Sequence, residues 1–253
     1  DLGNETEVIL EAGDDGELDE DDIAIEEEAG VSLEAEVDDQ DEGQKEHNDV
    51  IAKTFRGKAI AMMAAKGVRI EEDEANIACQ IFPRIAGLTH CVHDSAALKE
   101  RFANLVESDE SLAGSRRALS CCVPTCWNAD LECLMAHTHF KDIVEQLTSI
   151  ASLGLKGYQL SEAQWKMADD VQEILLLFDD VTKIFSTAEV PLIVDVIPTL
   201  EELREGLIGG RDDQVNKVSN TIRVACQAGI LLIDKYSAFA DDCDIYIIAI
   251  GIC

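Results

Sequence analysis

The sequence predicts a mainly α-helical protein whose second half is a helical bundle. Three observations support this. Apolar residues recur at spacings of three and four through several long stretches. From Trp127 to residue 244 no stretch has the composition of a strand, and the best strand candidate is the short segment 117–123, RALSCCV. Finally, residues 1–49 are so acidic and so poor in apolar side chains that we expect them to form a disordered linker.

The clearest element is residues 160–185, LSEAQWKMADDVQEILLLFDDVTKIF. Ser161 and Gln164 have the spacing of a capping box, and Leu160 is placed to pack on Trp165 as a hydrophobic staple. One face of the predicted helix carries Trp165, Ala168, Val171, Leu175, Phe178, Thr182 and Phe185. A helix with such an apolar face needs partners, so the neighbouring segments are expected to pack against it.

Charge is distributed unevenly along the 253 residues, whose formal net charge is −32. Residues 1–49 contain 22 Asp or Glu and one Lys, so the rest of the chain is only moderately acidic. The chain begins at Asp1 and ends in an apolar run, and we expect it to be a piece of a longer protein. Nine cysteines, with Cys121 and Cys122 adjacent, argue against a secreted disulfide framework. No apolar run reaches the roughly 18 residues of a membrane span, so no membrane partner is expected.

Before the strand candidate, the apolar patterns predict three helical segments. Residues 50–68 form the first, with Gly67 as a C-cap. Residues 77–106 divide into two helices, the second beginning at a cap supplied by Asp94 or Ser95.

After the strand candidate, residues 124–147 predict a turn followed by a helix, and residues 215–239 predict a last long helix. Residues 190–207 are helical in period but contain Pro191 and Pro198. Thr199 and Glu202 form a second capping box there, which favours a kink or a restart. Residues 209–213 are expected to form a loop.

Within the last helix, apolar spacing places one set of residues inside: Val218, Ile222, Ala225, Ile230, Ile233 and Tyr236.

Candidate chemistry is sparse. Cys133 and His137 would share a helix face and so allow a two-ligand metal site, but the alternative is a buried thiol and an imidazole without metal, because four ligands at usable spacing are lacking. The carboxylates Asp241, Asp242 and Asp244 allow either a cation site or a helix cap. No phosphate-binding loop, nucleophile elbow or zinc-protease helix is present, and basic residues are too few for a broad nucleic-acid footprint.

From residue 117 onward the order of motifs resembles the hAT superfamily of DNA transposases, particularly the fungal forms. VPTCWN at 123–128 resembles the family's V-[PS]-T-R-W-N-S-T element, and a connector like LGLKGYQLSEAQW follows. A long helix ending like LLLFDDVTKIFS precedes a PxxxxVIP helix, which residues 191–198 match. The final segment, KYSAFADDCDIYIIAIGIC, resembles the family's KYY…TDDSPIYRIATVLHP.

This resemblance implies three parts: residues 1–49 as an acidic linker, residues 50–123 as a partial ribonuclease-H-like α/β core, and residues 124–253 as an all-helical insertion domain. Family members cut and rejoin DNA with DDE carboxylates that bind two Mg²⁺ or Mn²⁺ ions. The resemblance places those carboxylates outside this chain. The chain is therefore expected to hold no cofactor and no catalytic residue of its own, and Asp241, Asp242 and Asp244 match a non-catalytic segment.

The resemblance also implies a contact with transposon-end DNA. Trp127 matches a Trp that lies near the family's active site, and Thr125 and Asn128 flank it in the same motif. Trp127 either stacks on a displaced base or anchors the first insertion helix in the core. The family's Arg is replaced by Cys126, and its Ser-Thr by Ala129 and Asp130, which removes a phosphate contact and adds repulsion.

The function expected from the sequence is therefore that of an internal segment of a nuclear hAT-type transposase, with oligomer contacts outside this chain. The alternative is a domesticated, non-catalytic helical module that binds other proteins.

Overall fold

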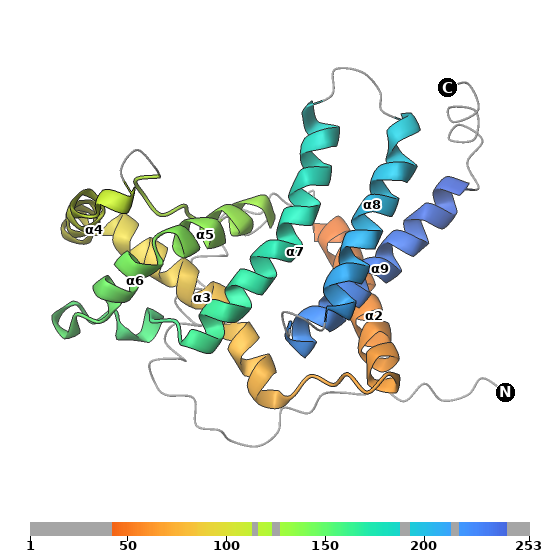
Figure 1. Cartoon of the computed structure of the whole chain (residues 1–253), viewed down its shortest axis with the longest axis horizontal. Coiled ribbons are helices and arrows are strands. Elements are labelled where there is room, and N and C mark those ends of the chain that lie inside the picture. Colours follow the sequence, from red (N-terminus) through yellow and green to blue (C-terminus); the bar gives the residue numbers. More distant parts are fainter. Residues whose placement is uncertain (1–41, 113–115, 123–126, 188–192, 214–217, 242–253) are drawn as a thin grey trace.

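A computed structural model describes residues 42–112, 116–122, 127–187, 193–213 and 218–241 (Figure 1). The α-helices in these ranges are α2 (Glu42–Ala65), α3 (Glu72–Asp94), α4 (Ala96–Ser108), α5 (Trp127–His139), α6 (Lys141–Thr148), α7 (Glu162–Thr187), α8 (Ile193–Asp212) and α9 (Asn220–Asp241). Short 3-10 helices span Glu110–Leu112, Ala151–Leu153 and Lys156–Tyr158. The described ranges contain no β-strand, which confirms the prediction of a mainly helical protein.

Buried side chains gather in three clusters. The first joins α3, α4, α5 and α6 to the first half of α7, and the second joins the second half of α7 to α8 and α9. The third lies between α2 and α9. Val171 on α7 packs against both the first and the second cluster, and Figure 1 shows α7 running between the two groups of helices. The division between the first and second clusters therefore falls within α7.

The start of α7 forms as predicted. The backbone N–H of Gln164 donates to Ser161 Oγ at 3.2 Å, and the Ser161 N–H donates to Gln164 Oε1 at 2.9 Å. This reciprocal pair satisfies two groups that a helix start otherwise leaves without partners. Leu160 and Trp165, the two residues of the predicted staple, are both buried in the first cluster.

Helix α2 ends as predicted and begins earlier than predicted. Gly67 has a φ of 81°, and the Val68 N–H donates to the Met63 carbonyl at 2.9 Å, which is the hydrogen bond of a Schellman motif. Val68 and Met63 are both buried, which supplies the accompanying apolar contact. The helix starts at Glu42, so the prediction that residues 42–49 have no structure is wrong. Their Glu, Gln and Lys residues favour helix and extend the helix formed by the apolar stretch. Residues 1–41 lie outside the described ranges.

Ser95, one of the two residues predicted to cap the second helix, separates α3 from α4. Its Oγ accepts a hydrogen bond from the Leu98 N–H at 3.4 Å. The segment predicted as one helix after Trp127 is instead divided into α5 and α6 at Phe140, whose φ and ψ of −99° and 22° interrupt the helix. Phe140 is fully buried, and its ring packs edge to face on Phe102 of α4 with centroids 5.2 Å apart.

The strand prediction for residues 117–123 is wrong over its described part, residues 117–122. A strand needs a neighbouring strand for its backbone hydrogen bonds, and none lies in the described ranges. The apolar composition reflects packing instead, since Leu119 and Cys122 lie against the first cluster as part of a loop. Val123 lies outside the described residues.

Of the two alternatives predicted at Pro198, a kink or a restart, the restart is wrong, because α8 is continuous from Ile193 to Asp212 with Pro198 inside it. Thr199, predicted to cap the restart, is a buried residue within the helix.

The loop predicted at 209–213 is wrong over 209–212, which belong to α8. Two glycines one helical turn apart explain this. A Cβ at Gly206 would lie 3.1 Å from Leu177 Cδ1, and one at Gly210 would lie 2.7 Å from Ile174 Cδ1. The glycines thus let α8 approach α7 closely, and this packing outweighs their weak helix propensity.

Helix α9 is buried on a wider face than its apolar spacing predicts. Val224 packs in the cluster with α2, whereas Cys226 and Ile230 pack in the cluster with α7 and α8. Ala225 and Tyr236, predicted inside, are exposed. The predictions are wrong at these two positions because α9 has partners on two sides, which a single-stripe pattern does not anticipate.

Candidate functional site

Trp127 is the first residue of α5 and is partly exposed. Its side chain is 39% accessible, although it is among the largest apolar residues of the chain. The indole makes a T-shaped contact with the ring of Phe178 on α7, with centroids 6.4 Å apart and an interplanar angle of 71°. The indole is therefore held by a protein contact and still presents surface to solvent, so both sequence interpretations, core anchor and exposed stacking residue, describe part of its environment.

Asn128 follows Trp127 in the first turn of α5. Its Oδ1 is buried and receives no hydrogen bond from any described residue. A buried acceptor of this kind is normally satisfied by water or by a ligand. The structure therefore places a partly exposed π surface next to a buried acceptor that no described residue satisfies. Thr125, the third predicted residue, lies outside the described residues.

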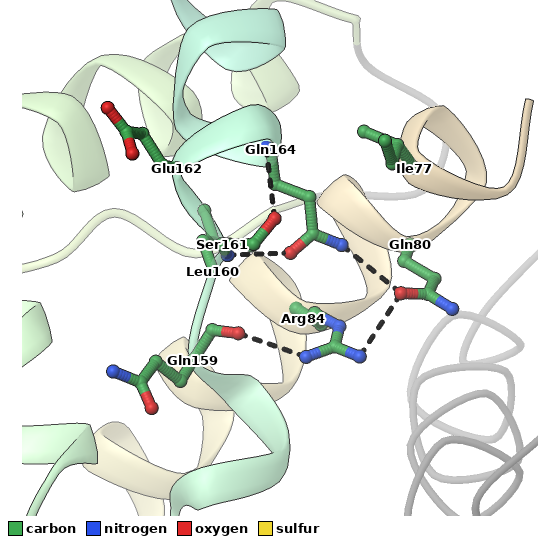
Figure 2. A pocket seen from close by; sticks show the side chains of 8 residues that line it. All are labelled: Ile77, Gln80, Arg84, Gln159, Leu160, Ser161, Glu162 and Gln164. Carbon is green, nitrogen blue, oxygen red and sulfur yellow. Dashed lines mark hydrogen bonds between the residues drawn. The ribbon is translucent and has the colours of Figure 1, made fainter. Parts of the chain in front are cut away.

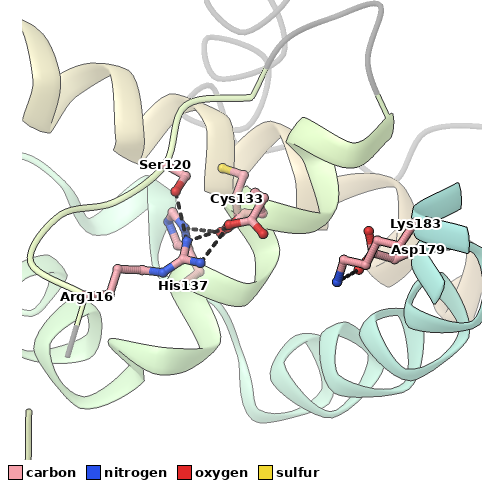
Figure 3. A network of polar contacts seen from close by, with 7 residues as sticks. Arg116, Ser120, Cys133, His137, Asp179 and Lys183 are labelled. Atoms are coloured by element: carbon pink, nitrogen blue, oxygen red, sulfur yellow. Dashed lines mark hydrogen bonds and ion pairs between the residues drawn. The ribbon is translucent and has the colours of Figure 1, made fainter. Parts of the chain in front are cut away.

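The cations near this part of α5 are engaged with carboxylates. Arg116 Nη2 lies 2.6 Å from Glu132 Oε2, and Arg116 Nη1 donates to Ser120 Oγ at 2.9 Å (Figure 3). On α7, Lys183 pairs with Asp179, which raises the pKa of the exposed lysine. Both interactions reduce the positive potential available to a phosphate group.

Asp130 makes this surface sensitive to protonation. It lies within the first turn of α5, and burial raises the pKa of its carboxyl group. A carboxylate there is attracted by the helix N-terminus, yet it opposes an approaching DNA phosphate.

The thiols and imidazole of α5 belong to the core. Cys133 and His137 lie on one face, as predicted, but His137 Nδ1 faces the backbone carbonyl of Cys133 at 3.2 Å and not its sulfur. Burial lowers the pKa of His137 to about 4. A hydrogen bond from Cys133, together with burial, raises the pKa of the Cys122 thiol. Among the described residues, no group of three His, Cys, Asp or Glu side chains is arranged to hold a metal ion.

A pocket of about 520 Å³ opens between α3 and the start of α7, and the sequence did not predict it (Figure 2). Gln80 Oε1 accepts hydrogen bonds from Gln164 Nε2 and from Arg84 Nη2, both at 3.1 Å. Arg84 Nη1 donates to the Gln159 carbonyl at 2.9 Å. The capping box singles out Gln164 in the sequence, but no sequence pattern connects Gln164 with Gln80, 84 positions earlier. These bonds join α3 to α7 beneath the pocket.

Comparisons with protein-family models, with curated proteins and with solved structures found no match to this chain. Within the described residues, no helix is both long enough and apolar enough to cross a membrane.

Proposed function

We propose that this chain is a segment of a hAT-type DNA transposase and that residues 127–241 belong to the helical insertion of its ribonuclease-H-like core. The observation that carries this proposal is the position of the resembling motifs. VPTCWN ends in the first two residues of α5, LGLKGYQLSEAQW covers the 3-10 helix Lys156–Tyr158 and the capped start of α7, and the match to PxxxxVIP includes the first six residues of α8. Each motif precedes or opens a helix in the order expected for the family.

The role proposed for this segment is contact with transposon-end DNA. Trp127 is partly exposed and held from one side by Phe178, which suits stacking on a displaced base. Asn128 Oδ1 is an unsatisfied acceptor beside the indole, but it is buried, so the proposed DNA contact rests on Trp127. Since Arg116 and Lys183 are paired with carboxylates, stacking rather than phosphate attraction would dominate.

Strand cleavage and joining would be performed by the intact parent protein. By the family resemblance, carboxylates outside this chain would bind the Mg²⁺ or Mn²⁺ ions, and oligomer contacts would also lie outside it. The proposed location of the parent is the nucleus.

The test is binding to a hairpin-ended duplex at low salt, measured by fluorescence anisotropy. Trp127→Ala is expected to weaken binding about tenfold, the value of one base-aromatic stack. Phe185→Ala is the matched control, because Phe185 is an aromatic residue of similar exposure, 37%, that lies outside the VPTCWN motif. Equal affinities of the two variants would refute the role of Trp127.

A second candidate is a non-catalytic module that binds proteins. It is favoured by exposed apolar side chains on α5 and α7, namely Trp127, Ile184 and Phe185. The same titration separates the two candidates, because a protein-binding module would show no affinity for the DNA end even at low salt.

A further inference from the structure

Helix α2 carries a concentration of positive charge that is exceptional in this acidic chain. Residues 50–70 contain five basic side chains and no Asp or Glu. All five are exposed: Lys53, Arg56, Lys58, Lys66 and Arg69.

Helix α9 adds a further cation beside them. The Lys58 and Lys235 ammonium groups lie 5.5 and 5.6 Å from the centroid of the same ring, that of Phe55. Lys235 also lies 5.5 Å from the ring of Tyr236. We name Lys53, Arg56, Lys58 and Lys235 the α2–α9 basic surface. The ion pairs found among the described residues involve other cations, so this positive charge is not neutralised by them.

We propose that the acidic segment 1–41 of this chain docks on the α2–α9 basic surface. That segment contains 19 Asp or Glu and no Lys or Arg. Residues 42–253 have a net negative charge as well, so most of the surface repels the segment. The α2–α9 basic surface is the complementary patch that the described residues offer to it.

The connection between segment and surface permits this contact. Residue 41 directly precedes α2, and the helix from Glu42 to Lys58 is about 25 Å long at 1.5 Å per residue. A chain of 41 residues can span more than about 130 Å, so it can return along α2. Because the segment is tethered, docking is intramolecular and its effective concentration is high.

Docking would also exclude other polyanions. A nucleic-acid backbone would need the same four cations, so the segment acts as a competitor in cis. This inference does not depend on the proposed contact at Trp127, which lies on α5.

The test is zero-length carbodiimide coupling of carboxylates to lysine amines in the full chain, mapped by mass spectrometry. Coupling of residues 1–41 is expected to favour Lys58 and Lys235 over the exposed lysines Lys99 and Lys156 by about fivefold or more at low salt. The preference is expected to disappear at about 1 M salt, where the Debye length falls to about 3 Å. Coupling in proportion to lysine exposure alone would overturn the proposal.

Two variants and one probe complete the test. The double variant Lys58→Glu, Lys235→Glu is expected to abolish the coupling of residues 1–41 to Lys53 as well. The double variant Lys99→Glu, Lys156→Glu changes the net charge by the same amount and is expected to leave the coupling to Lys53 unchanged. Replacing the Asp and Glu of residues 1–41 by Asn and Gln is expected to increase affinity for a fluorescent single-stranded oligothymidylate about tenfold or more. If the unmodified chain binds this probe equally well, the surface is open to nucleic acid and the proposal fails.

Discussion

The ring of Phe178 links Trp127 to the far side of the helical bundle. It forms a T-shaped contact with the Trp127 indole, and a Cβ built at Gly229 of α9 would lie 3.7 Å from Phe178 Cζ. Phe178 thus occupies the meeting point of α5, α7 and α9. The orientation of the indole depends on how α7 and α9 pack and not only on the first turn of α5.

Replacing Phe178 by Ala is therefore expected to expose the indole of Trp127 to solvent while the rest of the fold is kept. Because the ring is only half-buried, the substitution should lower the free energy of unfolding by about 2 kcal/mol, less than the about 3–5 kcal/mol of a buried Phe→Ala change. Acrylamide quenching of Trp127 fluorescence should rise, measured in a Trp165→Phe background that removes the buried indole. Phe185→Ala, at an exposed position of the same helix, should leave quenching unchanged. Unchanged quenching in the Phe178 variant would show that Trp127 is held by other contacts.

Restoring the family's cation at position 126 is expected to strengthen binding to a terminal-repeat DNA end. Cys126→Arg adds one phosphate contact, which should steepen the salt dependence of the association constant by about one unit. Cys126→Gln is the neutral control of similar length. Identical affinity and salt dependence in the two variants would contradict the proposed contact.

Two helical glycines are expected to respond oppositely to alanine. A Cβ at Gly87 of α3 would overlap the ring of Tyr158, with Cδ1 at 2.9 Å, whereas a Cβ at Gly209 of α8 meets no atom within 4 Å. Gly209→Ala should raise the free energy of unfolding by about 0.5–1 kcal/mol through helix propensity. Gly87→Ala should lower it by about 1–3 kcal/mol through overpacking. Urea unfolding measures both, and a stabilised Gly87 variant would mean that Tyr158 moves aside without cost.

The buried His137 is expected to make stability depend on pH. Its pKa is about 4 in the folded protein and 6.5 for an unburied imidazole, so between these values the unfolded state binds more protons. Stability should fall by about 3 kcal/mol as the pH decreases from 6.5 to 4. Asp130 and Asp170, whose carboxyl pKa values are raised by burial, act in the opposite direction at the acid end of this range.

Comparison with His137→Leu isolates the imidazole, because both proteins keep the carboxylates. The variant should lose the destabilisation between pH 6.5 and 4, whereas replacing the exposed His93 by Asn should retain it. Parallel curves of unfolding free energy against pH for wild type and His137→Leu would show that the imidazole is not the cause of the pH dependence.

Local signals predicted the elements that depend on nearby residues. The capping box of Ser161 and Gln164 and the C-cap at Gly67 involve residues within five positions of each other, and both form as predicted. The predictions fail where distant packing decides. Gly210 belongs to the segment predicted as a loop but lies inside α8, where the side chain of Ile174 on α7 approaches it.

The candidate site shows the same limit. The sequence selected Trp127 by resemblance, but it could not indicate that Phe178, about fifty positions later, holds the indole. Residues 117–122 have strand-like composition because Leu119 and Cys122 face the core, and composition alone does not reveal whether a pairing strand exists.

Helix α7 is shared by two hydrophobic clusters, and this has a consequence for the hydrogen exchange of its backbone amides. Because Val171 packs against both, the middle of α7 keeps one set of contacts when either group of helices unfolds alone. Backbone amides around Val171 should therefore exchange with deuterated solvent only when the whole bundle opens, whereas those near Thr187 exchange through local fraying. The middle of one helix would then report the cooperativity of the entire protein.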